Sequence, residues 1–368
     1  MANPPPPYNN ITGISRAAMK DNAQITLADY NGNARPGELV VDQTNDNLYV
    51  GNSSGSLTLI ASGSGTETWA TLGDKNNASG PSKIALGTNA GITSQGVGAV
   101  AVGNSAGYNT QGINSVAIGE GAGLTNQGNQ SVAIGQNAGA TQGSTAVAIG
   151  QNAGGGVAYQ GDDAVAIGHG AGANTQGTQS VAVGLYAGET TQGIQSVAVG
   201  KQAGQTTQGN YSVAVGQQAG TNTQGASAVA VGYLAGTTSQ GASAVAIGLN
   251  TGSNGQGTYS VAIGAGAGFD GQGNNSVAIG LDTGLTSQGT NSVAIGKQAG
   301  ETSQAANSII LNATGAALNQ TTANTFTVKP VRAVTSVTFA APTAGSIPAG
   351  FSPMYYNPTT GEIIVITT

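Results

Sequence analysis

The sequence contains no cysteine, few charges and few aromatic residues, and each scarcity excludes a class of protein. Without a thiol, the chain can form neither a disulfide framework nor a thiolate metal site. Charged residues make up 7% of the 368 residues and aromatic residues 4%, well below the usage of an ordinary globular domain. No apolar run is long enough to cross a bilayer as a helix, so we expect no membrane insertion.

Positive charge is scarcest in the central region. Between residues 84 and 304 the only Lys and Arg residues are Lys201 and Lys297, and the net charge of the whole chain is −6. A protein that binds nucleic acid needs a basic surface to neutralise phosphates. We therefore expect no nucleic-acid partner.

The N-terminus lacks the features of an export signal. The opening MANPPPPYNN has neither the basic start nor the apolar run of a secretory signal peptide. These residues therefore favour a chain that is not exported as a free bacterial surface protein.

What the chain has in abundance is a repeat. The pattern Ser/Ala-Val-Ala-Ile/Val-Gly, loosened to Ile-Ala-Leu-Gly in the first copy, occurs fourteen times, nearly always at sixteen-residue intervals. The closing glycines are Gly87, Gly103, Gly119, Gly135, Gly150, Gly168, Gly184, Gly200, Gly216, Gly232, Gly248, Gly264, Gly280 and Gly296. A fifteenth, degenerate copy ends at Asn312. A fixed short period over more than half of a chain is typical of a solenoid, in which each repeat is one coil.

Alternation within the repeat predicts a short strand with two unlike faces. Val and Ile lie on one face, and Ser, Ala and Gly lie on the other. We interpret the Val/Ile face as the inside of the coil. The face of small residues then predicts the close approach of a neighbouring subunit, unless these residues only relieve crowding at a tight bend.

The second half of each repeat carries Ala-Gly and then Gln-Gly. Gln-Gly follows eight residues after most closing glycines, so stacked coils about 4.8 Å apart should bring the Gln amides into a hydrogen-bonded ladder with a structural role. Two coils differ in length, at fifteen and eighteen residues, and the change falls between Ala-Gly and Gln-Gly. Since insertions are tolerated at surfaces, we expect this half of the repeat to face solvent.

The sequence predicts that the chain divides into five segments, of which the repeat is one. They are a Pro-rich arm (1–15), a small β-meander that serves as an attachment module (16–61), a linker (62–83), the solenoid (84–312) and a β-rich tip (313–368). The meander strands are expected at 38–42, 47–50 and 56–60, and the tip strands at 325–334, 336–341, 353–356 and 362–367.

Successive copies of Ser-Val-Ala-Ile-Gly, with a second glycine turn in each coil, resemble the YadA-like head of trimeric autotransporter adhesins. That resemblance covers residues 84–312 and implies a left-handed parallel β-roll in which three identical chains pack around an axis. The period is longer than is usual in that family. Residues 34–60, 307–332 and 354–363 are similar to segments of bacteriophage tail-fibre proteins, notably those of marine cyanophages, in which a self-cleaving chaperone domain often follows.

Few residues suggest chemistry, and the sequence predicts no catalytic, cofactor or metal site. His169 stands alone near an Ala-Gly turn, and Asp162 and Asp163 fall in the longest coil, where a solvated loop is the simpler interpretation. The candidate surface-binding residues are aromatics that interrupt columns of small polar residues: Tyr108, Tyr186, Tyr211, Tyr233, Tyr259 and Phe269. They suit stacking on sugar rings, and the alternative is that they fill the edges of coils or the seams between subunits.

Together these features favour a non-enzymatic, homotrimeric virion fibre or other appendage of a bacteriophage, which aids attachment to the host surface. Its expected partners are tail or capsid proteins, contacted through the N-terminal region, and host surface glycans. The alternative is the passenger of a bacterial trimeric autotransporter adhesin. A third class, a fibre-borne polysaccharide depolymerase, would need a carboxylate cleft that the sequence does not predict.

Overall fold

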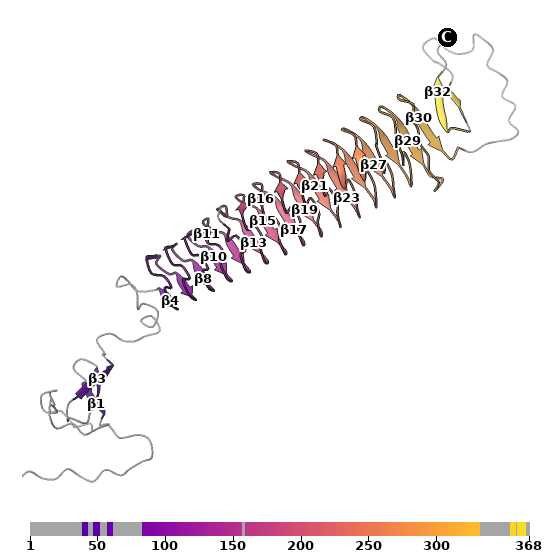
Figure 1. The fold of residues 1–368 in the computed structure, drawn as a ribbon. Helices are drawn as coiled ribbons and strands as arrows, with labels where there is room; N and C mark the ends of the chain where they lie inside the picture. Colours follow the sequence, from indigo (N-terminus) through magenta and orange to yellow (C-terminus); the bar gives the residue numbers. More distant parts are fainter. Residues whose placement is uncertain are drawn as a thin grey trace, which may run out of the picture. The chain divides into compact units, whose positions relative to one another are not determined.

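The structure, a computed structural model, describes residues 39–42, 47–51, 57–61, 83–156, 159–331, 354–357 and 359–365. The chain divides into two compact units, Met1–Lys75 and Asn76–Thr368. The elements among the described residues are all β-strands, which confirms the all-β class (Figure 1). The predicted arm (1–15) lies outside the described residues, as does the predicted linker (62–83) apart from Lys83.

The described part of the first unit is a small antiparallel meander. Its strands are β1 (Leu39–Asp42), β2 (Asn47–Gly51) and β3 (Leu57–Ala61), paired in the order β1-β2-β3. Each strand begins and ends within one residue of its predicted bounds. The turn residues in QTND and GNSSG divide the apolar runs, as expected from their preference for turns.

The second unit is a parallel β-solenoid built on a long ladder of short strands (Figure 1). Each coil contributes one Val-Ala-Ile-type strand, which pairs in register with the same residues of the next coil. These strands are β4 (Ile84–Leu86), β6 (Val100–Val102), β8 (Val116–Ile118), β10 (Val132–Ile134), β12 (Val147–Ile149), β13 (Val165–Ile167), β15 (Val181–Val183), β17 (Val197–Val199), β19 (Val213–Val215), β21 (Val229–Val231), β23 (Val245–Ile247), β25 (Val261–Ile263), β27 (Val277–Ile279), β28 (Val293–Ile295) and β29 (Ile309–Asn312). The predicted solenoid is therefore confirmed.

A second ladder of short strands runs along the other wall of the coils, and each of these strands ends at the repeat glutamine. Its strands are β5 (Ser94–Gln95), β7 (Thr110–Gln111), β9 (Asn126–Gln127), β11 (Thr141–Gln142), β14 (Thr175–Gln176), β16 (Thr191–Gln192), β18 (Thr207–Gln208), β20 (Thr223–Gln224), β22 (Ser239–Gln240), β24 (Asn254–Gln256) and β26 (Asp270–Gln272). Gln160 of the eighteen-residue coil bridges Gln142 and Gln176, so the register survives both irregular coils.

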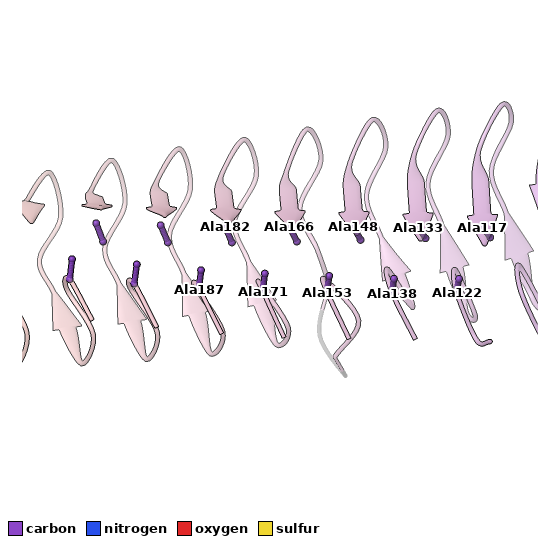
Figure 2. Close-up of a cluster of buried hydrophobic side chains, with 14 of the residues drawn as sticks. Ala117, Ala122, Ala133, Ala138, Ala148, Ala153, Ala166, Ala171, Ala182 and Ala187 are labelled. Atoms are coloured by element: carbon purple, nitrogen blue, oxygen red, sulfur yellow. The ribbon is translucent and has the colours of Figure 1, made fainter. Parts of the chain in front are cut away.

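Alanine fills the inside of the coil, and the predicted orientation of the strand faces is wrong. The central Ala of the strands from β6 to β28 is fully buried, whereas the Val and Ile on either side are half-buried or exposed. In Figure 2 the central alanines, such as Ala117 and Ala133, point toward the alanines of the Ala-Gly turns, such as Ala122 and Ala138. Where the central and turn alanines meet, the two walls approach so closely that only methyl groups fit between them, so the larger Val and Ile side chains point outward.

Most glutamine amides form hydrogen bonds within their own coil instead of the predicted ladder of hydrogen bonds between coils. The side chains are buried, but each typically donates from Nε2 to the carbonyl of the first strand residue of its own coil, as Gln111 does to Val100 at 2.7 Å. Contacts between successive glutamines occur in four pairs: Gln127–Gln142, Gln240–Gln256, Gln272–Gln288 and Gln288–Gln304. Because the amide reaches across a narrow interior, the opposite wall is closer than the next amide.

The closing glycines are required by backbone geometry. Gly119 has a φ of +124°, and a Cβ placed there would lie 2.7 Å from the carbonyl oxygen of Gly135 in the next coil. An L-residue would be strained in this conformation and would also clash with that backbone. The spacing of the repeat therefore depends on glycine at this position.

The C-terminal end of the ladder is modified by larger residues and a hairpin. Ile310 takes the place of the central Ala in β29 and is fully buried together with Ala299 and Leu318. Beyond the predicted boundary at residue 312, the parallel pairing continues to β30 (Phe326–Lys329). An antiparallel hairpin, β31 (Met354–Tyr356) and β32 (Glu362–Val365), then pairs through β32 with β30. The strand predicted at 336–341 lies outside the described residues.

Candidate interaction surfaces

The most extensive unusual surface of the second unit is apolar. We call it the Val/Ile face; it consists of the first and third residues of each Val-Ala-Ile-type strand of the first ladder, from β4 to β28. In β8, for example, Val116 is half-buried and Ile118 is exposed, while the Ala117 between them is buried. Fourteen such strands at about 4.8 Å spacing make a face roughly 65 Å long. Contiguous apolar surface of this extent is uncommon on a monomer and marks an interaction site.

Further exposed apolar residues border the Val/Ile face on both sides. One group immediately follows the closing glycines, and the other lies two or three residues before the first strand residue. The first group comprises Leu185, Tyr233, Leu249 and Leu281, and the second comprises Val97, Ile113, Ile194, Tyr211 and Tyr259. The face with its two borders therefore holds most of the exposed large apolar side chains of the described coils.

Charge is absent from the Val/Ile face itself. Each of its positions is Val, Ile or Leu, so a partner that covered it would bury no ionised group. Burying an unpaired charge would be costly, whereas burying aliphatic side chains is worth roughly 1.5–3 kcal/mol for each residue fully removed from water. The face is therefore suited to permanent burial against another apolar surface.

A depression of about 620 Å³ lies where the Val/Ile face meets the terminal hairpin. Ile309 and Phe326, both exposed, line it together with Glu362 and Ile363 of β32. Since Ile309 pairs with Phe326, and Phe326 with Ile363, the apolar surface continues from the coils onto the hairpin.

The opposite wall is polar. The residue before each buried Gln of the second ladder is exposed in most coils, and most of these residues are Thr or Ser. Threonine and serine hydroxyls can exchange hydrogen bonds with water without burying apolar surface. The expectation that this half of the repeat faces solvent agrees with the structure.

The six candidate aromatics occupy four different repeat positions. Tyr108 and Tyr186 are half-buried, whereas the exposed fractions are 55% for Tyr211, 47% for Tyr233, 65% for Tyr259 and 37% for Phe269. Tyr211 and Tyr259 share a repeat position but stand three coils apart, about 14 Å along the axis. The structure does not gather the six into one patch.

The polar candidates form local contacts. His169 lies against the ring of Tyr186 in the next coil, with 5.1 Å between ring centroids. In the eighteen-residue coil, Asp162 Oδ1 accepts hydrogen bonds from the Ser144 amide at 2.9 Å and the Tyr159 hydroxyl at 2.8 Å. Asp163 accepts one from the Thr145 hydroxyl. Both carboxylates therefore join this coil to the preceding one.

Tyr159 is a surface aromatic that the sequence analysis missed. Partial burial, the hydrogen bond to Asp162 and the charge of that carboxylate raise the pKa of Tyr159 to about 12. Within the described ranges, no group of three or more His, Asp or Glu residues is arranged to hold a metal ion. Nor do those ranges contain a helix suited to crossing a membrane.

A sequence signal for the true orientation of the faces was present. The central residue is Ala in all fourteen regular copies, whereas the flanking positions vary among Val, Ile and Leu. A narrow interior demands one small size, while an outward face tolerates several. The exposed Leu185, Leu249 and Leu281 beside this face give a second signal, because they share one repeat position.

Comparison with protein families identifies the repeat. A family model of two copies of the YadA head domain repeat matches residues 127–153, 160–187, 192–219, 208–235 and 286–299. The chain thus carries YadA head domain repeats, and its coils form a YadA-head-like β-roll. Neither a curated protein nor a solved structure matches the chain.

Proposed function

We propose that the chain is a non-enzymatic fibre protein that works as a homotrimer and holds an attachment surface away from the particle or cell that bears it. The observation that carries this proposal is the continuous, uncharged Val/Ile face in a chain with YadA head domain repeats. YadA-head proteins are typically homotrimeric, and this face supplies a surface through which three such chains would meet.

The borders of the face favour three chains over two. A closed three-fold ring requires each chain to contact two neighbours with different surfaces. The residues after the closing glycines and those before the strands provide two separate apolar edges, one on each side of the Val/Ile face. With the three axes parallel, each edge would meet a different neighbour. The exposed Tyr211, Tyr233 and Tyr259 then belong to the seams between chains.

Assembly is tested by placing a charge on the Val/Ile face. Val199 is half-buried in the single chain, so Val199→Asp should be compatible with the coil but would bury a carboxylate in the trimer. Sedimentation should give three chains for the wild type and mostly monomer for this variant. The matched control is Thr207→Asp on the polar wall, which should remain trimeric. A monomeric wild type, or two equally trimeric variants, would contradict the proposal.

For its location we propose a bacteriophage virion, as a tail fibre or other appendage, with the N-terminal unit bound to tail or capsid proteins. This part of the proposal rests only on the resemblance to tail-fibre segments inferred from the sequence at residues 34–60, 307–332 and 354–363, since no curated protein matches the chain. A bacterial trimeric adhesin is the alternative, and the YadA head repeats fit it equally well. Antibodies against the chain should label purified virions if the first proposal holds and bacterial surfaces if the second does.

The proposed absence of catalysis rests on the arrangement of the acidic side chains. Asp162 and Asp163 are the only two acidic residues that are adjacent in sequence in the described coils. The carboxylate of each accepts hydrogen bonds from residues of the same chain. A depolymerase would need two carboxylates poised across a sugar. Incubating the trimer with host polysaccharide should release no reducing ends, and their release would contradict this part of the proposal.

A further inference from the structure

One place on the polar wall departs from the repeat in two successive coils. Most coils carry two polar residues, commonly Thr, before the buried Gln, as in Gln205-Thr206-Thr207, but two coils read Ser253-Asn254-Gly255 and Phe269-Asp270-Gly271. Here β24 and β26 are three residues long instead of two. Pairing between β22 and β24 is reduced to Gln240–Gln256, whereas β20 and β22 pair over two residues.

The two glycines leave open space where most other coils carry a hydroxyl side chain. A Cβ at Gly255 would have no neighbour closer than 4.0 Å, and one at Gly271 none closer than 3.8 Å. By contrast, a Cβ at the closing glycines would lie within 3 Å of backbone in the next coil. Gly255 and Gly271 are therefore not required by close packing, although their φ values of +82° and +72° suit glycine.

A depression of about 350 Å³ opens at this place. Its lining includes Thr223, Ser239, Gly255 and Gly257, together with the buried Gln240 and Gln256. It is shallow and open to solvent, so it would contact one face of a ligand rather than enclose it.

On the same two coils, polar and aromatic residues directly precede Gly255 and Gly271, although their own side chains do not line the depression. Asn254 Nδ2 donates to Asp270 Oδ1 at 2.7 Å, which fixes an exposed amide and an exposed carboxylate next to each other. Phe269 is 37% exposed, and its carbonyl accepts the Asn254 amide at 2.8 Å, so the two residues are backbone neighbours.

We propose that this depression, together with the neighbouring Asn254, Phe269 and Asp270, is a binding subsite for a neutral or amino saccharide. The C–H face of a pyranose stacks on an aromatic ring, while its hydroxyls donate to carboxylates and exchange hydrogen bonds with amides and hydroxyls. The charge of Asp270 and the net charge of −6 disfavour uronic or sialic acids. This inference rests on the proposed attachment function and names the class of surface ligand.

The test restores the repeat at this place. The triple variant Phe269→Gln, Asp270→Thr and Gly271→Thr recreates Gln205-Thr206-Thr207, a sequence that already folds in a coil of this chain. The full-length protein is titrated with maltohexaose, cellohexaose and N-acetylchitohexaose as neutral or amino probes and with hexagalacturonate as the acidic probe, followed by saturation-transfer NMR. The control Ile92→Gln removes an exposed apolar residue at the repeat position of Phe269, far along the rod.

The wild type and the Ile92→Gln control should bind at least one neutral or amino probe and should not bind hexagalacturonate. The triple variant should bind the same probe about tenfold more weakly or not at all. Failure of the wild type to bind any neutral or amino probe, preference for hexagalacturonate, or equal binding by the triple variant would overturn the subsite. The proposed function fails separately, through a monomeric wild type or through absence of the chain from virions and cell surfaces. A wild-type trimer that is present on virions but binds no probe would refute the subsite alone.

Discussion

At the residue scale, alanine decides how thick a coil can be. The central and turn alanines meet inside the coil, and both are fully buried through most of the solenoid. Where a turn position is Thr instead, at Thr251 and Thr283, the hydroxyl donates to the closing glycine carbonyl of the next coil, so the polar group is satisfied. At the turn position the interior thus accepts the methyl group of Ala or the hydrogen-bonded side chain of Thr.

Enlarging a central alanine should therefore destabilise folding. Ala198→Leu would force three extra carbons between two walls that leave no space, at a cost of about 1–3 kcal/mol in the free energy of unfolding. Thr206→Leu, at an exposed position on the polar wall, should change stability by less than about 0.5 kcal/mol. Denaturant unfolding of the two variants measures the difference, and equal stabilities would contradict an alanine-filled interior.

Tyr159 gives the chain a titration in the alkaline range. Because its pKa is raised to about 12 from the ordinary 10.0, the folded state favours the neutral phenol. The stabilising contribution is complete below pH 10 and is lost as pH rises toward 12. A phenolate absorbance titration, taken as wild type minus Tyr159→Phe, should show this midpoint, and Asp162→Asn should lower it. A midpoint near 10 in the wild type would contradict the hydrogen bond to Asp162.

At the element scale, the terminal hairpin completes the ladder. A parallel ladder ends in a strand with unpaired backbone groups, which invites association with other chains. Here β32 pairs antiparallel with β30 and covers part of that edge. Pairing of β31 with β32 then moves the free edge to a short strand of three residues.

Removing residues 354–368 should therefore expose the edge of β30 and lead to aggregated or unassembled protein. Removing residues 1–61 is the matched deletion, because it leaves every described strand of the second unit in place. Light scattering and sedimentation of both truncations distinguish them. A silent C-terminal deletion, combined with loss of assembly after the N-terminal one, would show that the hairpin does not protect the ladder.

The period and the alternation of the sequence predicted the positions of these strands well. They could not predict features that depend on the distance between the two walls of a coil. The strands from β6 to β28 lie where the Val-Ala-Ile pattern places them, because backbone pairing follows the period directly. Alternation separated Ala117 from Val116 and Ile118 but could not show which face was inward, because that depends on the distance between the walls. Likewise, Gln111 was predicted to be structural, but its partner on the opposite wall depends on that same distance.

The candidate site was predictable only in part for a related reason. Phe269 stood out because it broke a column of polar residues, yet its significance comes from the glycines, the strand lengthening and the Asn254–Asp270 contact beside it. The scattered tyrosines also interrupt columns of polar residues, but without this combination of features in adjoining coils. A single exceptional residue in a repeat is therefore a weaker indication than several exceptions in adjoining coils.

At the scale of the whole molecule, the second unit is close to a one-dimensional array. Each coil contacts mainly its neighbours, so stability should be the sum of coil and interface contributions. The fifteen- and eighteen-residue coils show the tolerance of this arrangement, since the ladder through Gln142, Gln160 and Gln176 continues across them. What the array requires is that equivalent positions of successive coils stay opposite each other.

Deleting two whole coils should accordingly shorten the rod without unfolding it. Removal of residues 201–232 joins Gly200 to Tyr233 and restores a regular repeat, so the product should fold, keep its oligomeric state and be about 10 Å shorter. Removal of residues 201–224 takes away less of the chain but joins Gly200 directly to Gly225, so one coil loses both its Ala-Gly and its Gln-Gly turns. That product has no turn alanine to meet the central alanine at the junction, and it should fold poorly there or aggregate. Circular dichroism melts and small-angle scattering of the two deletions measure the contrast. If the larger deletion unfolds the chain while the smaller one is tolerated, stacking of equivalent coils is not what holds the rod together.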